Sequence, residues 1–461
     1  MPSHSALSPA VQTITTTCRV ASGVFAPGHL GELTRIVPFE MVDQALAATS
    51  STRRRTRRLP ARVVVYLLLA GCLFAELGYR QVWHKLTAGL AGLPVANPSD
   101  SALWQARARL GTTPLRWLFD LLRGPAATCR AAGGVYWCGL LVCAIDGTSM
   151  SVPDGARNLA AYSKQPGNHG GSGYPLLRLV ALVACGTRTI IDAVFGPTSI
   201  GEAGYTRRLA RSLHCGMIVL ADRNFDNAGL IGELAATDAH LLVRLKSNRK
   251  LPVLRHYRDG SYLSQIGTTR VRVVQCEITI ATAAGRHTGY YRLATTLLDA
   301  HRYPAPTLVT LYHDRWEIET CYLELKSSIL GNRVLRARTP AGIAQELYAL
   351  LVTYQILRIA ITDAIDTHGG IDPDRGSFTV ALQAARDQLT RAASVIAEAV
   401  IDLVGAIGRR VLDNLLPDRR LRISPRIVKR AISKYQARGP NINRRSYKAT
   451  LAINILAGPG P

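Results

Sequence analysis

The stretch LYHDRWEIETCYLELKSSIL, residues 311–330, predicts a helix whose sides differ in chemistry. At about 100° per residue, one narrow sector collects a phenol, two cations and a carboxylate: Tyr312, Arg315, Lys326 and Glu319. A second sector is apolar and predicts a core-facing stripe, formed by Leu311, Ile318, Leu325 and Ile329. Glu317 and Glu324 fall roughly 140–160° away from Glu319. A plain surface helix would scatter its charges, so the pattern favours a functional face.

The spacing of the four polar residues, Tyr-x2-Arg-x3-Glu-x6-Lys, resembles the signature of the insertion-sequence-four family of bacterial transposases. That family is a branch of the DDE enzymes, which have a ribonuclease H-like core. The resemblance implies that Glu319 is the third metal-binding carboxylate. It also implies that Tyr312, Arg315 and Lys326 hold transposon-end phosphates near the cleavage site. The resemblance covers about residues 31–448 and requires two aspartates upstream.

Asp146 and Asp222 are the aspartates that fit this requirement. The run LLVCAI, residues 140–145, predicts a buried strand that delivers Asp146 at its C-terminal end, and GMIVLA predicts another before Asp222. The motif Ala-Asp-Arg-x-Phe around Asp222 also resembles the second acidic motif of the family. An aspartate at a strand end more often caps a turn, so either residue alone indicates little.

The order of the predicted elements strengthens this interpretation. Residues 176–196 predict a hairpin beside the first strand, and residues 202–213 predict a basic amphipathic helix. The strand with the second aspartate follows, and then the helix with Glu319. That order is the ribonuclease H-like progression.

The predicted fold class is α/β, with a ribonuclease H-like catalytic core over residues 139–360 and a β-rich insertion at about 241–306. A small helical, DNA-binding domain is predicted over residues 31–130, whereas residues 1–30 are predicted to be disordered apart from one short strand. Within the helical domain, residues 98–122 predict two helices with Ser99 or Ser101 as N-cap. A helix-turn-helix DNA reader and a plain helical hairpin both fit them. The apolar run 63–75 is shorter than the roughly 20 residues of a membrane helix and predicts a buried helix.

The insertion and the C-terminal region are rich in cations. We expect the insertion to follow a DNA backbone with Arg244, Lys246, Arg249, Lys250, Arg255, Arg258, Arg270 and Arg272. The insertion contains no Trp, so a displaced base would have to stack on Tyr262, Tyr290, Tyr291 or His287. Residues 361–461 predict a helical region with a basic tail, which from position 417 holds eleven Lys or Arg against one Asp. A solvated tail and a DNA arm both fit, and counterion release favours the arm.

The composition indicates a polyanionic partner. Lys and Arg number 56 against 31 Asp and Glu, a formal net charge of +25 over 461 residues. Double-stranded DNA is the leading candidate, and an anionic membrane is the alternative. Nine scattered Cys without a C-x2-C pair predict neither a disulfide framework nor a zinc site. Because the N-terminus is also unlike a secretory signal, we expect a cytoplasmic protein without a membrane span.

Carboxylates in this order suit metal-dependent phosphodiester chemistry. Two divalent ions about 3.5–4 Å apart activate a water and stabilise the leaving oxygen, and Mg²⁺ prefers carboxylate oxygens. As the resemblance implies, Asp146 would bridge two Mg²⁺ ions while Asp222 and Glu319 each complete one, with Mn²⁺ able to substitute. We predict a cut-and-paste transposase that acts on the terminal inverted repeats of its element and on target DNA, as a homodimer on DNA. A catalytically silent DNA-binding protein and a ribonuclease H-like nuclease without strand joining are the alternatives.

Overall fold

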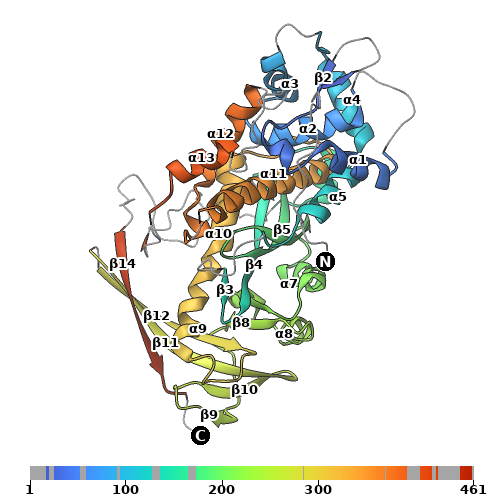
Figure 1. Cartoon of the computed structure of the whole chain (residues 1–461). Helices are drawn as coiled ribbons and strands as arrows, with labels where there is room; N and C mark the ends of the chain where they lie inside the picture. Colours follow the sequence, from blue (N-terminus) through green and yellow to red (C-terminus); the bar gives the residue numbers. More distant parts are fainter. Residues whose placement is uncertain are drawn as a thin grey trace.

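The computed structural model describes residues 17–19, 25–51, 59–90, 94–126, 135–164, 173–283, 285–368, 370–391, 405–417, 422–423 and 447–458. Helices from both halves of the chain gather at one end of an elongated molecule (Figure 1). A mixed sheet occupies the middle, and the long strands of the insertion extend it to the other end.

The predicted N-terminal helical region is present. Its helices are α1 Phe39–Ala48, α2 Ala61–Leu73, α3 Tyr79–Thr87, α4 Asp100–Leu110 and α5 Thr113–Leu122, with 3-10 turns at Leu33–Arg35 and Ala88–Leu90. Residues 63–73 of α2 are all buried, which confirms the buried-helix prediction. Ser99 caps α4, because its hydroxyl accepts a hydrogen bond from the Ala102 amide at 3.2 Å. The two predicted helices are confirmed as α4 and α5, and the apolar side of α5 packs against α1 and α11. Whether the pair acts as a DNA reader or a plain hairpin stays a prediction.

The prediction of disorder over residues 1–30 is wrong in part. Strands β1 Thr17–Arg19 and β2 Phe25–Pro27 pair antiparallel. His29 and Leu30 follow them and are fully buried against the N-terminal helices, where a ring nitrogen of His29 hydrogen-bonds the Leu86 carbonyl. Burial of this kind orders the segment. Residues 1–16 and 20–24 lie outside the described part of the chain.

The middle of the molecule is a mixed sheet. Its strands are β4 Leu140–Ser151, β5 Leu176–Ala184, β6 Ile190–Pro197, β7 Met217–Ala221 and β8 His240–Arg244, in the spatial order β6-β5-β4-β7-β8. Strands β4, β5 and β6 form an antiparallel meander, whereas β7 runs parallel to β4 and β8 runs parallel to β7. The short β3 Tyr136–Trp137 pairs with β4, and α6 Ala156–Ala161 follows β4 in the chain. The predicted hairpin, helix and second strand therefore occur in the predicted order.

The prediction that the first strand ends before Asp146 is wrong. Strand β4 continues to Ser151 because its second half still pairs with β5, whereas β7 pairs with β4 only as far as Ile145. Asp222 directly follows β7, as predicted. Since Ile145 pairs with Ala221, Asp146 and Asp222 are neighbours at the point where the parallel partner ends.

Both aspartates point to the same face of the sheet. Two hydrophobic cores lie on the two faces of the sheet. Cys143 and Ile145 of β4 pack on the face covered by α7 Glu202–Leu209 and α8 Ala228–Ala235, whereas Val142 and Ala144 pack on the other face. Side chains alternate along a strand, so the Asp146 side chain lies on the same face as Val142 and Ala144. The same alternation along β7 places Asp222 there.

The insertion extends the core sheet. Its strands are β9 Arg255–His256, β10 Tyr262–Ile266, β11 Thr269–Thr282 and β12 Gly285–Thr295, and β12 pairs with β8. The predicted boundary at residue 241 is too early, because β8 is parallel to β7 and belongs to the core.

Some of the predicted DNA-contacting side chains of the insertion are used inside the fold. Arg272 is fully buried and donates a hydrogen bond to the Tyr303 carbonyl, and Arg249 forms an ion pair with Asp226. Tyr262 is also buried and cannot stack a displaced base there. Five of the cations are exposed, and their contact with DNA stays a prediction: Lys246, Lys250, Arg255, Arg258 and Arg270.

Three further helices complete the helical end of the molecule: α11 Pro340–Asp366, α12 Phe378–Thr390 and α13 Gly405–Asp413. Helix α11 is long and apolar enough to cross a membrane, but 78% of its apolar window is buried inside the protein, as in the core helix of a soluble protein. It contacts α2, α5, α12 and α13. These contacts explain its apolar character without a membrane.

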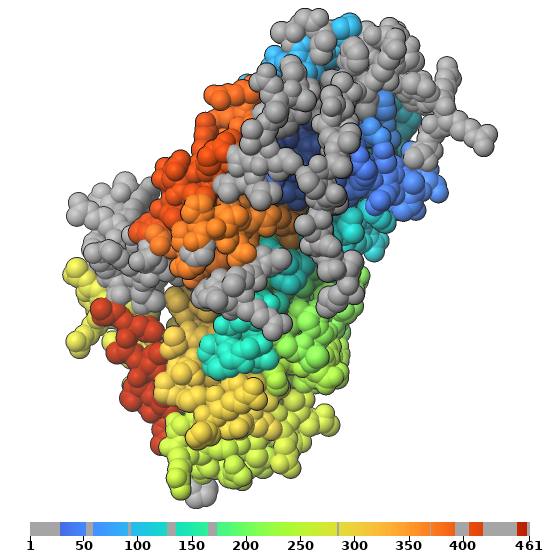
Figure 2. Space-filling view, in the orientation of Figure 1, coloured from blue at the N-terminus to red at the C-terminus, as the bar shows by residue number. Residues whose placement is uncertain are grey.

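A strand near the end of the chain pairs with the insertion. Strand β14 Tyr447–Leu456 pairs antiparallel with β11, and β13 Arg422–Ile423 pairs with β14. Figure 2 shows β14 on the surface, at the edge of the sheet formed by the insertion. This part of the predicted basic tail is therefore neither a free tail nor an unfolded arm. Most of the other tail residues, 418–421 and 424–446, lie outside the described residues.

Candidate active site

The predicted helix at residues 311–330 belongs to a longer helical segment, residues 305–329, which we call the glutamate helix. It consists of α9 Ala305–Tyr312, a 3-10 turn His313–Arg315, α10 Trp316–Leu323 and a π-helical stretch Glu324–Ile329. Helix α9 contacts β11 and β14, and α10 contacts β4 and β5, so the segment crosses one face of the sheet (Figure 1). The predicted apolar stripe is buried, including Ile318 and Leu325.

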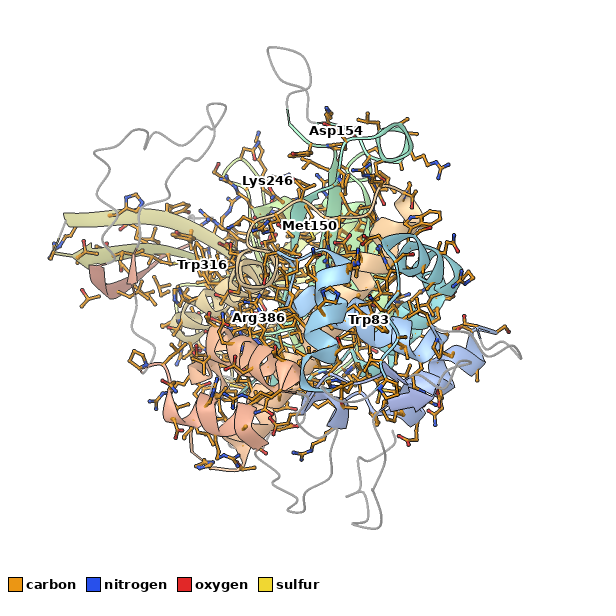
Figure 3. All side chains as sticks on the ribbon, turned by 90° about the horizontal axis from the view of Figure 1, so that it is seen from above. Trp83, Met150, Asp154, Lys246, Trp316 and Arg386 are labelled. Atoms are coloured by element: carbon orange, nitrogen blue, oxygen red, sulfur yellow. The ribbon has the colours of Figure 1, made fainter. Side chains whose placement is uncertain are left out.

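Arg315 connects the first aspartate with the glutamate. Its guanidinium lies 3.4 Å from Asp146 Oδ2 and 2.9 Å from Glu319 Oε1. The guanidinium also lies 5.4 Å from the ring centre of Trp316, the partly exposed first residue of α10 that is labelled in Figure 3. The structure thus brings Asp146, Arg315 and Glu319 together as the sequence predicted. Asp222 joins them through the register of β4 and β7.

Lys326 and Tyr312 reach the same end of the sheet. The Lys326 ammonium donates a hydrogen bond to Thr148 Oγ1 at 3.2 Å, on the side of β4 that carries Asp146. The Tyr312 hydroxyl donates to the Ala221 carbonyl at 3.2 Å, directly before Asp222. Tyr312 is only 8% exposed, so in this structure it holds the glutamate helix against β7. Contact of its hydroxyl with a phosphate would require this hydrogen bond to break.

Sequence reasoning missed Tyr322, which lies beneath Asp146. Its buried hydroxyl donates to the Asp146 carbonyl at 2.6 Å and accepts from the Ala181 amide at 3.1 Å. Asp146 and Ala181 are opposite residues of β4 and β5, so this hydroxyl joins both strands to the glutamate helix. Helical spacing from Glu319 to Tyr322 places both residues near one face. That spacing was the only signal in the sequence.

Glu317 and Glu324 occupy a buried ion-pair cluster on another side of the helix. Arg188, in the turn between β5 and β6, donates to Glu317 Oε2 at 2.5 Å. Arg358 of α11 donates to Glu324 Oε2 at 3.0 Å, and the Tyr354 hydroxyl donates to the same oxygen at 3.1 Å. The sequence correctly separated these glutamates from Glu319. It did not indicate that they are buried, because both cations come from distant segments.

Asp146 lies in an environment that opposes its ionisation. The pKa of Asp146 is raised to about 7: burial is the main cause, the nearby Asp222 and Glu202 carboxylates add to it, and the Gly147 amide and Arg315 oppose it. The Gly147 amide donates to Asp146 Oδ1 at 2.7 Å. Asp222 accepts a hydrogen bond on Oδ1 from the Asn224 amide, also at 2.7 Å. A bound cation would relieve the repulsion between these carboxylates.

The donor set fits a divalent metal. Carboxylate oxygens are the ligands that Mg²⁺ prefers, and two of these carboxylates already share a cation, the Arg315 guanidinium. In the part of the chain that the structure describes, no three His, Cys, Asp or Glu side chains lie close enough to form a ready metal cage. Arg315 stands between two of the carboxylates, so metal binding would require its guanidinium to move.

Comparisons with known proteins identify the family of the chain. Residues 27–120 match the family model described as the insertion element 4 transposase N-terminal region, and residues 137–356 match the transposase DDE domain. The chain is 28% identical over 415 residues to the transposase InsG for insertion sequence element IS4 of Escherichia coli (strain K12), across 86% of this chain and 91% of that protein. A solved structure of the piggyBac transposase synaptic complex with hairpin DNA is 12% identical, with a TM-score of 0.41 over 84% of each chain. The two family matches cover the site and the helical domain before it, so the chain belongs to the IS4-type DDE transposases and is an enzyme of that type.

Proposed function

We propose that this transposase cuts the ends of a bacterial insertion element and joins the freed 3′-hydroxyls to target DNA by two-metal phosphoryl transfer. The observation that carries the proposal is that Asp146 neighbours Asp222 where the parallel strand pair ends and shares the Arg315 guanidinium with Glu319. A ribonuclease H-like core is inferred from the strand order β6-β5-β4-β7-β8, with the glutamate helix packed across it.

Asp146, Asp222 and Glu319 would hold two Mg²⁺ ions, with Mn²⁺ as a substitute. When bound, such ions supply a strong nucleophile from water and stabilise the leaving oxygen. Arg315 lies between Asp146 and Glu319, and Lys326 lies beside them at Thr148, where cations can bind the phosphates on either side of the scissile bond. Tyr312 contributes by holding the glutamate helix to the end of β7 and, as the family signature implies, by contact with DNA.

The expected partners are the terminal inverted repeats of the element and a target duplex, bound by a homodimer in the cytoplasm. The net charge of +25 supports a polyanionic partner. The exposed cations of the insertion extend from the same sheet that carries the site. They would follow the backbone of the DNA beyond the cleavage site.

The test is a cleavage and joining reaction with purified protein, DNA carrying the element ends, and Mg²⁺. We expect nicked, cut and joined strands, which mapping at nucleotide resolution would identify. Asp146→Asn and Asp222→Asn should abolish both steps and keep binding to the ends, because each removes a carboxylate charge and leaves the basic surface intact. Cutting without joining would favour the nuclease alternative, and binding without cutting by the unaltered protein would favour a silent DNA-binding protein.

A further inference from the structure

A fourth carboxylate lies beside the two aspartates. Glu202 is the first residue of α7, on the face of the sheet opposite the glutamate helix. Its charge interacts with that of Asp146 and with that of Asp222. Sequence patterns did not single it out, because an acidic residue in the first turn of a helix is common.

Glu202 can approach from the opposite face because the sheet has a gap at this point. Strand β7 ends at Ala221, while β4 continues through Gly147. A Cβ atom at Gly147 would lie 2.7 Å from both Cγ and Oε1 of Glu202. The Glu202 side chain therefore occupies the space that any other residue after Asp146 would fill. This contact explains why glycine follows the aspartate.

Asn224 holds Glu202 and Asp222 at the same time. Its side chain forms a hydrogen bond with the Glu202 carboxylate, and its backbone amide donates to Asp222 Oδ1 at 2.7 Å. Arg178 is the cation whose charge acts on Glu202, but its guanidinium donates to the carbonyls of Thr198 and Ile200. Within the described residues, no ion pair joins Glu202 to a Lys or Arg. Asn224 thus holds the Glu202 carboxylate toward Asp222.

We propose that Glu202 is a fourth carboxylate of the metal centre and binds the same divalent ions as Asp146 and Asp222. The inference rests on the proposed two-metal function. Two divalent ions carry four positive charges, whereas Asp146, Asp222 and Glu319 supply three negative charges and Arg315 already neutralises part of them. Glu202 supplies the missing negative charge from the face of the sheet that Glu319 does not reach.

Binding of Mn²⁺ to the full-length, DNA-free protein, measured by isothermal titration calorimetry, tests the proposal. Glu202→Gln keeps the shape of the side chain and removes its charge, so we expect the Mn²⁺ affinity to fall by about 10- to 100-fold or one site to be lost. Glu233→Gln is the matched control, since Glu233 is an exposed glutamate on α8 that pairs with Arg207. It should bind Mn²⁺ as the unaltered protein does. The Mg²⁺ concentration for half-maximal cleavage should rise in parallel for Glu202→Gln alone.

Gly147→Ala provides an independent variant, because its methyl group would displace the Glu202 carboxylate. We expect it to weaken Mn²⁺ binding in the same way while the thermal melt shows a folded protein. Wild-type Mn²⁺ affinity in Glu202→Gln, together with lost affinity in Asp146→Asn, would overturn the role of Glu202 and leave the proposed function standing. Wild-type affinity in Asp146→Asn as well would overturn both.

Discussion

Replacement of each glutamate of the glutamate helix by glutamine should separate chemistry from stability. Glu319 is 32% exposed at its side chain and pairs with Arg315. Glu317 and Glu324 are buried, at 1% and 6% exposure; both pair with Arg188, and Glu324 also pairs with Arg358. We expect Glu319→Gln to melt like the unaltered protein and to have no detectable cleavage. Glu317→Gln and Glu324→Gln should instead lose stability.

The size of the stability loss follows from the buried cluster. Removal of one partner of a buried ion pair costs about 3–5 kcal/mol, a large part of the roughly 5–15 kcal/mol that stabilises a typical fold. Glu324→Gln should be the worse of the two, because Glu324 accepts hydrogen bonds from Arg358 and Tyr354 and lies 3.7 Å from Arg188. The entropy of unfolding grows with chain length, and for 461 residues it gives about 1 °C per kcal/mol, so Tm should fall by about 3–5 °C. For Glu319→Gln, loss of a partly exposed pair should cost no more than about 1 kcal/mol.

The assay combines thermal melts with single-turnover cleavage of element ends in Mg²⁺, at a temperature well below the lowest Tm. At that temperature Glu317→Gln and Glu324→Gln should recover most of the cleavage rate, because neither side chain faces Asp146. A wild-type Tm together with abolished cleavage in Glu317→Gln or Glu324→Gln would refute the reasoning. Unimpaired cleavage in Glu319→Gln would refute it as well.

Three further outcomes are expected. Tyr322→Phe leaves the Asp146 carbonyl and the Ala181 amide without their hydroxyl partner. The free energy of unfolding should therefore fall by about 1–3 kcal/mol, and cleavage should slow. An unchanged denaturation curve would contradict this. Burial raises the pKa of Asp146 to about 7, so the folded state favours the protonated form, and stability present at low pH is lost as pH rises from about 4 to 7. Metal-free Asp146→Asn should therefore be the more stable protein at pH 8, by on the order of 4 kcal/mol at most, and no more stable at pH 4; equal gains at both pH values in urea unfolding would contradict the assignment. Replacement of the Lys and Arg residues at positions 419–445 by Gln should weaken DNA binding and flatten its salt dependence; an unchanged salt slope would mean that the tail does not touch phosphate. Deletion from residue 447 should instead increase aggregation, because it removes β14 and exposes the edge of β11.

Patterns within single elements were sufficient for much of the site. The apolar runs before Asp146 and Asp222 predicted buried strands, and both aspartates do follow the last paired residues of β4 and β7. Helical spacing grouped Arg315, Glu319 and Lys326: Arg315 and Lys326 do reach β4, and Glu319 pairs with Arg315. Such properties depend on the order of residues along one helix or strand, so they can be read without knowledge of the fold.

Other features depended on segments that are distant in sequence. Strand β4 continues past Asp146 because β5 pairs with it there, and Glu202 comes within reach of the aspartates because β7 has ended. Burial of Glu317 and Glu324 required Arg188 and Arg358 to meet them, and the C-terminal strand found its partner in the insertion. The order of residues along one helix or strand is enough to assign the side chains that share a face. Which charges are buried and which carboxylates approach one another depends on the packing of distant segments, because burial and ion pairing need partners from other elements.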